Sequence, residues 1–290
     1  MKPIQFTVSV YGEGVFAVLE DKKENFYNYY HRHDEAQITY ILKGKGTIMV
    51  GNIMQSFQSG DIFVLKPNEP HMFDRDTESE EDKGDIHAIH IFVNLERMKK
   101  LYHIPEFEAV RDYLQDLHTS KMLDRSISES MIHYFTNLLV KTGMPRFTEF
   151  LQLLHALTVH RNDTVTLYSG VRDMSYSDKD GVRISQVYKY TFERYQEDIT
   201  IDQVAALVHM TPTSFCKFFK KHTMKTYITF LNEVRIEKAC QILLNNKSEN
   251  ISEAAFQVGF NNIVHFNRVF KSITKMSPKK YIQAHSADIT

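Results

Sequence analysis

Residues 214–221, SFCKFFKK, and residues 265–272, HFNRVFKS, are two versions of one short sequence that lie 51 positions apart. Upstream the correspondence continues at an offset of 50, so the second copy has one additional residue just before this stretch. The chain therefore contains a duplicated unit, and we expect both copies to fold in the same way. The matching aromatic and basic positions are Phe215/Phe266, Lys217/Arg268, Phe219/Phe270 and Lys220/Lys271.

Each copy begins with the capping signature of a short helix. Thr200 and Gln203 in the first copy have the spacing of a capping box, in which each side chain binds the other residue's backbone amide. Asn250 and Glu253 have the same spacing in the second copy. Small and apolar residues follow both pairs at helical spacing. The sequence thus predicts a short amphipathic helix at the start of each copy.

A tight turn and a second helix are expected next. Gly259 can adopt the positive φ that such a turn requires, and His209 occupies the equivalent place in the first copy. Pro212 suits the first turn of a new helix. Two short helices joined by a tight turn, occurring twice, predict two helix-turn-helix motifs. On the second helix of the first copy we expect Phe215, Phe218 and Phe219 to be buried and Lys217, Lys220 and Lys221 to be exposed.

A single long helix is expected to join the two motifs. Residues 226–246 carry apolar side chains every three or four positions. A helix of about 19 residues is about 28 Å long, close to the roughly 34 Å between successive major grooves on one face of DNA. One chain could therefore place two recognition helices in adjacent major grooves. Arg235 lies within the apolar stripe of this helix, so we expect it to form a buried structural ion pair.

The sequence VRIEKACQILL at residues 234–244, followed by ISEAAFQVGFNNIVHFNRVFKSITKMSPKKY at 251–281, resembles the signature of the AraC/XylS family of bacterial transcription regulators. The resemblance covers about 100 of the 290 residues. It departs from the family pattern where glycine is usual, at Met224 and Lys275, and where an aromatic residue is usual, at His265. The residues that carry it are Arg235, Ile236, Ala239, Leu243, Ala255, Gly259, Phe260, Phe266, Arg268, Phe270, Ser277, Pro278 and Tyr281.

The resemblance implies which side chains contact DNA. Arg268 can form a bidentate pair with guanine, and Lys217 can donate to the same acceptors. Lys220 and Lys271 are expected to contact phosphate, which positions a protein without reading sequence. The residues implied to face base edges are Thr213, Cys216 and Lys217 on the first recognition helix and Asn262, His265, Asn267 and Arg268 on the second.

Charge is distributed unevenly along the chain. From residue 184 onward there are 14 Lys and Arg against 9 Asp and Glu, which leaves 21 against 27 for residues 1–183 out of totals of 35 and 36. A basic C-terminal part beside an acidic N-terminal part is typical of a DNA-binding domain joined to a domain of another kind. We expect three segments: an effector-binding and dimerisation domain at 1–161, a polar linker at 162–183, and a DNA-binding domain at 184–290.

Secretion and membrane insertion are not expected. The chain has no signal peptide and no apolar run of about 18 residues. Cys216 and Cys240 are the only cysteines and lack a metal or redox spacing, so we expect reduced thiols. These features indicate a cytoplasmic protein.

Residues 1–95 predict a run of short strands. Alternating β-branched or aromatic residues are interrupted by glycine and proline, a pattern typical of a barrel or jelly roll. This segment resembles the two motifs of cupin barrels, and the residues that carry the resemblance are His31, His33, Gln37, Gly44, Gly60, Pro67 and His71. Strand alternation places the side chains of His31, His33, Gln37 and Thr39 on one face, and the resemblance implies that this face is the interior.

Two interpretations of this interior are open. In a metal-binding cupin, His31, His33 and His71 would hold a divalent ion together with a glutamate, but Gln37 stands at that position, so we expect no metal and no other cofactor. Imidazole, amide and hydroxyl groups also suit a small effector such as a sugar. We therefore expect an effector pocket formed by His31, His33, Gln37, Thr39 and His71, with Phe26, Tyr27, Tyr29 and Tyr30 near its entrance.

Three amphipathic helices are predicted after the strands, at 105–118, 126–141 and 145–157, preceded by an acidic loop at 74–85. The family resemblance implies that this helical block makes a dimer contact. The sequence thus predicts a two-domain α+β regulator, not an enzyme: a cupin-like β-barrel with a helical dimerisation block, then an all-α domain with two helix-turn-helix motifs. Its expected partners are promoter direct repeats, a small effector, RNA polymerase and a second copy. The alternative is a metal-dependent cupin enzyme fused to a DNA-binding domain.

Overall fold

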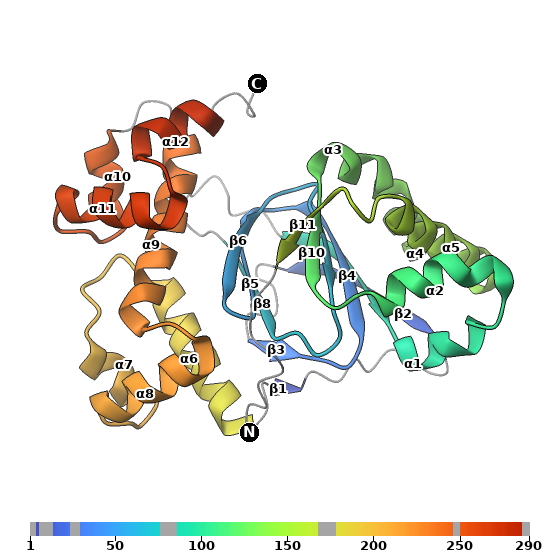
Figure 1. The fold of residues 1–290 in the computed structure, drawn as a ribbon, viewed down its shortest axis with the longest axis horizontal. Coiled ribbons are helices and arrows are strands. Elements are labelled where there is room, and N and C mark those ends of the chain that lie inside the picture. The colour runs from blue at the N-terminus through green and yellow to red at the C-terminus, as the bar shows by residue number, and fades with distance from the viewer. Residues whose placement is uncertain are drawn as a thin grey trace. The chain divides into compact units, whose positions relative to one another are not determined.

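The computed structural model describes residues 4–5, 14–23, 30–75, 86–167, 178–245 and 250–285, and the chain divides into two units, Met1–Gly181 and Val182–Thr290. The N-terminal unit combines β-sheets with a helical block, and the C-terminal unit is helical (Figure 1). This confirms the predicted fold class. Among the described residues, no helix has the length and apolar content needed to span a membrane.

The described strands of the N-terminal unit form two sheets. One sheet has the order β1-β3-β8-β5-β6, and the other β11-β10-β7-β4-β9-β2. All strand pairs are antiparallel except β1 with β3. The strands are β1 (Ile4–Gln5), β2 (Phe16–Lys23), β3 (His31–Arg32), β4 (Ala36–Lys43), β5 (Gly46–Val50), β6 (Ile53–Phe57), β7 (Ile62–Leu65), β8 (His71–Arg75), β9 (Ile86–Val93), β10 (Ser120–Leu123) and β11 (Thr164–Leu167).

The six-stranded sheet separates two hydrophobic clusters. On β4, Ile38 and Tyr40 pack in a cluster with the helices, whereas Ile41 belongs to the cluster enclosed between the sheets. Ile48 and Phe73 of the other sheet close that inner cluster. We call the enclosed space the barrel. The two-residue alternation predicted for this strand is therefore present, and it directs Gln37 and Thr39 to the same side as Ile41.

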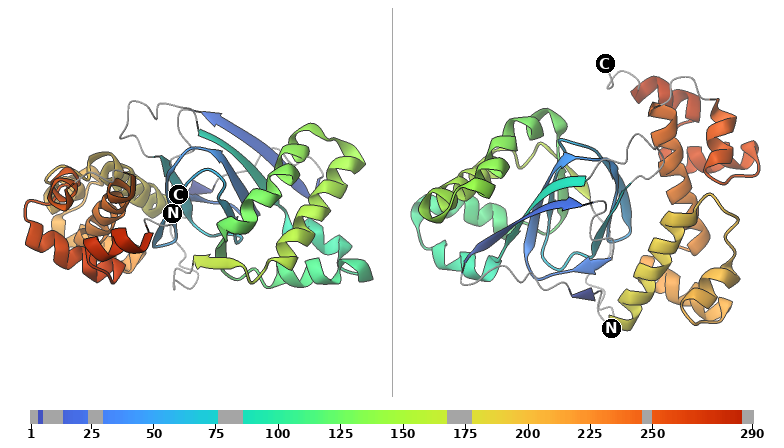
Figure 2. Two further views of the ribbon diagram at one scale, coloured as in Figure 1. Left: turned by 90° about the horizontal axis from the view of Figure 1, so that it is seen from above. Right: turned by 180° about the vertical axis from the view of Figure 1, so that it is seen from behind.

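The helical block lies on the outer face of the six-stranded sheet, as the green helices in both views of Figure 2 show. All three helices predicted from the sequence are present, but the first is divided into η3 and α2 and the second into α3, η4 and α4. Phe135 of α4 and Phe150 of α5 are fully buried in this layer. The elements are α1 (Leu95–Met98), η2 (Lys99–Leu101), η3 (Pro105–Phe107), α2 (Glu108–Gln115), α3 (Arg125–Ser128), η4 (Glu129–Met131), α4 (Ile132–Val140) and α5 (Gly143–Val159).

Two segments differ from expectation. Gly46, which we expected to interrupt strands, begins β5 and pairs with Phe57 and Arg75. The stretch expected to be linker contains β11, which pairs with β10, and the beginning of α6 at Asp178. Four-residue strands have no measurable periodicity, so the pairing partner rather than the local sequence creates them. Residues 76–85 of the expected acidic loop lie outside the described residues, and Asp74 and Arg75 belong to β8.

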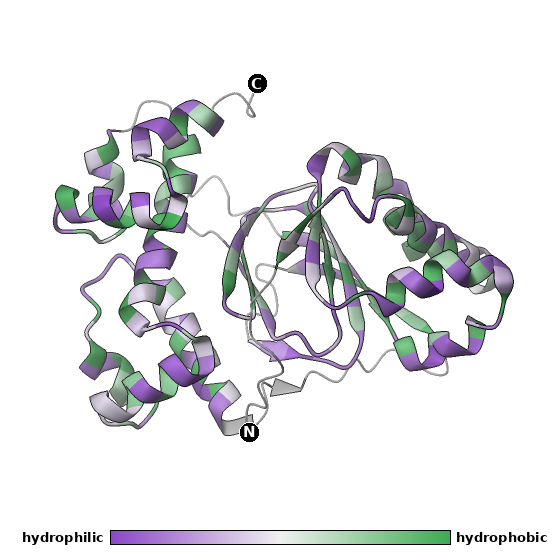
Figure 3. Cartoon of the chain, in the orientation of Figure 1, coloured by the Kyte–Doolittle hydropathy of each residue, from purple (hydrophilic) through white to green (hydrophobic). Residues whose placement is uncertain are grey.

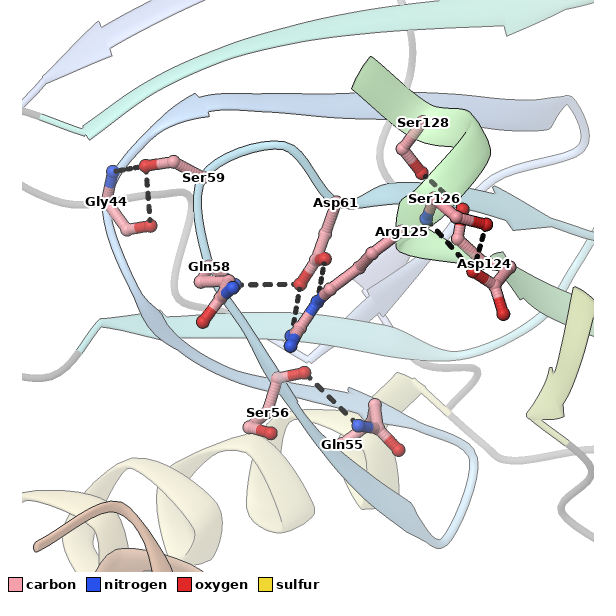
Figure 4. A network of polar contacts seen from close by, with 10 residues as sticks. All are labelled: Gly44, Gln55, Ser56, Gln58, Ser59, Asp61, Asp124, Arg125, Ser126 and Ser128. Carbon is pink, nitrogen blue, oxygen red and sulfur yellow. Dashed lines mark hydrogen bonds and ion pairs between the residues drawn. The ribbon is translucent and has the colours of Figure 1, made fainter. Parts of the chain in front are cut away.

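A buried carboxylate fixes the turn that leads into β7. The side chain of Asp61 is fully buried. Its oxygens accept hydrogen bonds from Arg125 Nε at 2.7 Å, from Arg125 Nη2 at 3.2 Å and from the backbone amide of Gln58 at 2.8 Å (Figure 4). Arg125 belongs to α3, so this pair ties the helical block to the barrel. Its guanidinium side chain is half exposed, and solvent therefore weakens the attraction.

We expect mutation of Arg125 to lower the stability of the protein more than mutation of Asp61. Arg125→Ala leaves a buried carboxylate without its counter-charge and should cost about 1–3 kcal/mol. Asp61→Asn should cost less, because the amide oxygen can still accept and the half-exposed guanidinium of Arg125 can be hydrated. Urea denaturation of the two variants and of the double variant measures this. Equal single losses that add in the double variant would show that the two residues act independently.

The C-terminal unit consists of α6 (Asp178–Arg194), α7 (Ile201–Leu207), α8 (Pro212–Thr223), α9 (Tyr227–Asn245), α10 (Ile251–Gln257), α11 (Ile263–Thr274) and α12 (Pro278–His285). The 19-residue helix α9 lies between the two pairs α7–α8 and α10–α11, which confirms the long connecting helix (Figure 1). Hydrophobic and hydrophilic residues alternate along these helices (Figure 3). The ring of Phe230 in α9 packs in tilted and edge-on contacts with Tyr188, Phe192 and Phe219, which joins α6 and α8 to one core.

Candidate functional site

The helix-turn-helix caps follow the sequence closely in the first copy. Thr200 and Gln203 form the predicted capping box of α7. The second copy differs, because Asn250 accepts from the amide of Ser252 rather than of Glu253. An asparagine side chain commonly closes such a two-residue turn. Both helices nevertheless start where the duplicated sequence predicts.

The turns of the two copies also have the same backbone conformation. His209 has φ 54° and Gly259 has φ 88°, so both adopt the left-handed conformation. The recognition helices then end at Met224 with φ 59° and Lys275 with φ 64°. These are the two positions at which the family resemblance implies glycine. The loop geometry is therefore kept, at the cost of about 1–2 kcal/mol that a side chain pays in this region.

The recognition helices α8 and α11 present their polar faces to solvent. Phe215 and Phe219, and likewise Phe266 and Phe270, are fully buried beneath them, while Phe218 is only partly buried. All side chains expected to contact bases or phosphate are exposed, and each lies on or at the start of one of these two helices: Thr213, Cys216, Lys217, Lys220, Asn262, His265, Asn267, Arg268 and Lys271.

Two of these residues already have partners within the protein. The side-chain oxygen of Asn262 accepts from the amides of Val264 at 2.8 Å and His265 at 3.2 Å, so Asn262 is the N-cap of α11. The imidazole of His265 packs edge-on to Phe260, with 5.5 Å between ring centroids. Thr211 caps α8 in the same way as Asn262 caps α11. The duplication contained this signal, because Thr211 and Asn262 are 51 residues apart.

Arg235 links the two motifs, and its partners are not those we expected. Its Nε and one terminal nitrogen donate to the backbone carbonyls of Tyr195 and Glu197, each at 2.8 Å. Its guanidinium lies 5.6 Å from the ring centroid of Phe260. The expected ion pair is thus replaced by carbonyl acceptors, which satisfy the planar fork of arginine without a second buried charge. Burial lowers the pKa of Arg235.

Gly259 packs against this set of Arg235 contacts with Tyr195, Glu197 and Phe260, which we call the Arg235 brace. A Cβ atom at this position would be 2.8 Å from the carbonyl oxygens of Tyr195 and Gln196 and 3.0 Å from the Arg235 guanidinium. Glycine is therefore required here by contact as well as by its φ angle. The loop after α6, the middle of α9 and the turn before α11 meet at this point.

In the barrel, a cluster of polar side chains is closed off from solvent. Gln37 and Thr39 lie on β4, His71 begins β8, His31 begins β3 and His33 follows it. Their exposed fractions range from 0% to 7%. The structure thus brings together all five residues expected to form the effector pocket. Their function there is a proposal, taken up below.

Two of these imidazoles have a defined tautomer. His33 Nδ1 lies 3.0 Å from the carbonyl oxygen of Glu35, and His71 Nδ1 lies 2.8 Å from that of Glu69. A carbonyl oxygen only accepts, so each Nδ1 carries the proton. Burial lowers the pKa of His33, and burial with the neighbouring His31 lowers the pKa of His71 well below its usual value. Both rings are therefore neutral near pH 7, and each Nε2 presents a lone pair.

Gln37 lies at the centre of the cluster. Its side-chain oxygen is 2.8 Å from His33 Nε2 and 3.1 Å from His71 Nε2, while its nitrogen is 2.8 Å from Thr39 Oγ1 and 3.2 Å from His90 Nδ1. The Gln37 oxygen and the two Nε2 atoms are all hydrogen-bond acceptors, and with both imidazoles protonated at Nδ1 no proton lies between them. A half-turn of the amide would aim its NH₂ at both imidazoles, and a cation between the three atoms would also satisfy them.

The donor set fits a divalent transition metal. His31, His33 and His71 each place one ring nitrogen within 4.8 Å of the others. A tetrahedral zinc ion with bonds of about 2.1 Å would need these nitrogens about 3.4 Å apart, which small side-chain rotations could achieve. The Gln37 oxygen could be the fourth ligand, and imidazole with a neutral oxygen suits zinc, iron or nickel.

One member of the cluster was missed from the sequence. His90 of β9 is 6% exposed and its Nδ1 lies 2.9 Å from Thr39 Oγ1 on the paired strand. The alternation of IHAIHIF placed it on the face of Ala88, which was the available signal. Tyr30 is also buried, and its hydroxyl donates to the Gly51 carbonyl at 2.7 Å. Phe26, Tyr27 and Tyr29 lie outside the described residues.

Two protein families match this chain. Residues 13–130 match the family described as AraC-like ligand binding domain, and residues 204–284 match the helix-turn-helix domain family. The first match contains the whole barrel cluster. The second contains both recognition helices and α9.

Relatives extend over most of the chain. The helix-turn-helix transcriptional regulator YdeC of Bacillus subtilis is 23% identical over 256 residues, covering 88% of this chain and 86% of YdeC. A regulator from Pseudoalteromonas carrageenovora is 39% identical over 98 residues, which is 34% of this chain and 57% of that protein. The C-terminal domain of the response regulator AraT of Geobacillus stearothermophilus has a TM-score of 0.34 at 25% identity, covering 35% of this chain and 84% of that domain. With a ligand-binding domain of the AraC type followed by a double helix-turn-helix domain, the chain belongs to the AraC family of DNA-binding transcription regulators.

Proposed function

We propose that this regulator binds a small effector inside the barrel and, as a homodimer, activates transcription from direct repeats at a promoter. The observation that carries the proposal is the enclosed cluster of His31, His33, Gln37, Thr39 and His71 within the segment that matches a ligand-binding family. Buried polar side chains that converge on one space are typical of a binding site. The helix-turn-helix domain binds DNA, and the barrel supplies its regulation.

The cluster favours an effector with hydroxyl groups. His33 and His71 present neutral nitrogens that accept hydrogen bonds, and Gln37 and Thr39 can both donate and accept. A hydroxyl group can serve either kind of partner, so a small polyhydroxylated compound such as a sugar fits. Such a ligand needs no metal.

The helical block supports a dimer. Several apolar side chains of α4 and α5 are exposed, with Val140 at 77%, Met144 at 71% and Val159 at 61%. A second copy of this chain would cover them. An effector-dependent change in that dimer would alter how the two DNA-binding domains reach adjacent repeats and RNA polymerase. The proposed site of action is the cytoplasm, where the promoter lies.

Selection of bound fragments from the source genome tests the proposal. Purified full-length protein at near-physiological salt should recover a few fragments, each with two half-sites about one helical turn apart. Recovery of DNA without sequence preference, with a steep salt dependence, would instead indicate a non-specific architectural protein. The genes beside the recovered sites indicate which compounds to test as effectors.

Effector and operator should also affect each other equally. If the effector tightens operator binding by some factor, the operator must tighten effector binding by the same factor. Calorimetric titration of effector with and without operator measures this. Identical affinities would contradict regulation through binding.

A second candidate function rests on the histidine cluster alone. As a metal-dependent cupin enzyme, the barrel would hold zinc, iron or nickel through His31, His33, His71 and Gln37, and the ion would act as a Lewis acid or redox centre. The residues fit such an ion, although a relative that matches 88% of this chain is described as a transcriptional regulator.

Elemental analysis separates the two functions. We expect the full-length protein, purified without chelator, to contain well under one equivalent of transition metal. Near-stoichiometric metal that is lost in a His31→Ala/His33→Ala variant but kept in a His87→Ala/His160→Ala variant would favour the enzyme. The control histidines lie outside the cluster.

A further inference from the structure

Val264 is an apolar side chain in an exposed place. It lies in the first turn of α11 and is 73% exposed, the second largest exposure among the large hydrophobic residues described. The apolar side chains at Phe266 and Phe270 of the same helix are fully buried. The core therefore does not account for a valine at this position.

The helical geometry places Val264 among the proposed DNA contacts. At about 100° per residue, positions 264, 267, 268 and 271 fall on one stripe of α11, and the side chains of Asn267, Arg268 and Lys271 are all exposed there. The duplication gives the same result independently. At the offset of 51, Val264 corresponds to Thr213, which begins the equivalent stripe of Thr213, Cys216, Lys217 and Lys220 on α8.

The surroundings indicate what would cover this valine. Arg268 and Lys271 give its stripe two positive charges, and the described stripe contains no acidic residue. A basic helix face complements the major groove, where thymine alone presents a methyl group to an apolar side chain. An apolar protein surface that covered Val264 would leave the charges of Arg268 and Lys271 without a counter-charge.

The geometry points to Val264 as a specificity-determining residue that reads a thymine methyl group in the half-site bound by α11. This inference rests on the assignment of α11 to the major groove. It also changes which residue begins the face of α11 that contacts bases. Asn262, expected to contact a base, uses its side-chain oxygen to cap the helix, and Val264 takes the place that Thr213 has in the first copy.

Replacing thymine by deoxyuridine tests the inference, because it removes the methyl group and leaves the hydrogen-bonding edge intact. The duplex is a preferred fragment recovered from the genome, with each thymine replaced singly. Wild-type full-length protein should lose affinity about fourfold at one thymine beside the α11 half-site, which corresponds to about 0.8 kcal/mol for one buried methylene-sized group. Val264→Ala should weaken binding to the unmodified duplex and bind both duplexes equally.

Ile273→Val is the matched control. Ile273 is a second exposed apolar residue of α11 at 38%, but it lies nine positions from Val264 and so on the opposite side of the helix. This variant should keep the wild-type response to deoxyuridine. Identical deoxyuridine profiles for wild type and Val264→Ala would overturn the role of Val264 alone. Absence of any preferred fragment for the wild type would overturn sequence-specific regulation, and the role of Val264 with it.

Discussion

Gly259→Ala is expected to destabilise the second helix-turn-helix motif by about 2–5 kcal/mol. The left-handed backbone costs a side chain about 1–2 kcal/mol, and forcing a methyl group into a packed site costs about 1–3 kcal/mol more. Here the new Cβ would lie 2.8 Å from the carbonyls of Tyr195 and Gln196. The turn must move, and the Arg235 brace that holds the same loop must loosen with it.

Hydrogen-exchange mass spectrometry on the full-length protein measures this locally. Peptides from α10 and α11 should exchange faster, while those of the barrel stay protected. His209→Ala is the matched control, because His209 already carries a Cβ at the equivalent turn with φ 54°. It should change stability by less than about 1 kcal/mol. If both variants behaved alike, the close approach of the Tyr195 loop would have no energetic role.

Removing Lys217 and Arg268 together should abolish preference for the operator. Each residue can pair with guanine in the major groove, and a good pair contributes about 1–3 kcal/mol of discrimination. The double variant Lys217→Ala/Arg268→Ala should therefore lose about 2–6 kcal/mol and bind its preferred fragment roughly 30-fold to 25,000-fold more weakly, while affinity for unrelated DNA changes little. Fluorescence anisotropy with specific and unrelated duplexes measures both affinities.

Lys220→Ala/Lys271→Ala provides the comparison, because it removes the same charge from the same two helices. As phosphate contacts, these lysines should weaken binding to every duplex alike and reduce the slope of affinity against salt by about two. An equal loss on all sequences for the Lys217 and Arg268 variant as well would show that those residues do not read bases.

The C-terminal fold could be predicted because its sequence is written twice. Two matching copies predicted the helix starts, the turns and the burial of Phe215, Phe219, Phe266 and Phe270, because each copy supports the assignment made for the other. The hydrogen bond of the second cap and the partial exposure of Phe218 were not predicted. The partners of Arg235 could not be predicted in this way. They are backbone carbonyls about 40 residues away, and a carbonyl exists at every residue, so no side chain marks them in the sequence.

The barrel site was predictable only in part. Strand alternation placed Gln37 and Thr39 on one face, and the cupin resemblance implied that this face is the interior. Neither could reveal that His90 would lie beside Thr39, because that depends on the register between β4 and β9. Val264 was missed for the opposite reason. An apolar residue on an amphipathic helix is usually buried, and the exposed fraction shows that this one is not. Its correspondence with Thr213 at the offset of 51 was the available sequence signal.

The brace at Arg235 also limits how the two motifs can move relative to each other. By holding the loop after α6 against the turn before α11, it resists any change in the distance and angle between α8 and α11. If the protein cannot adjust, the duplex must curve to meet both helices, at a cost of order 1–6 kcal/mol that depends on the stiffness of the base steps in between. Base pairs that no side chain touches would then influence operator strength.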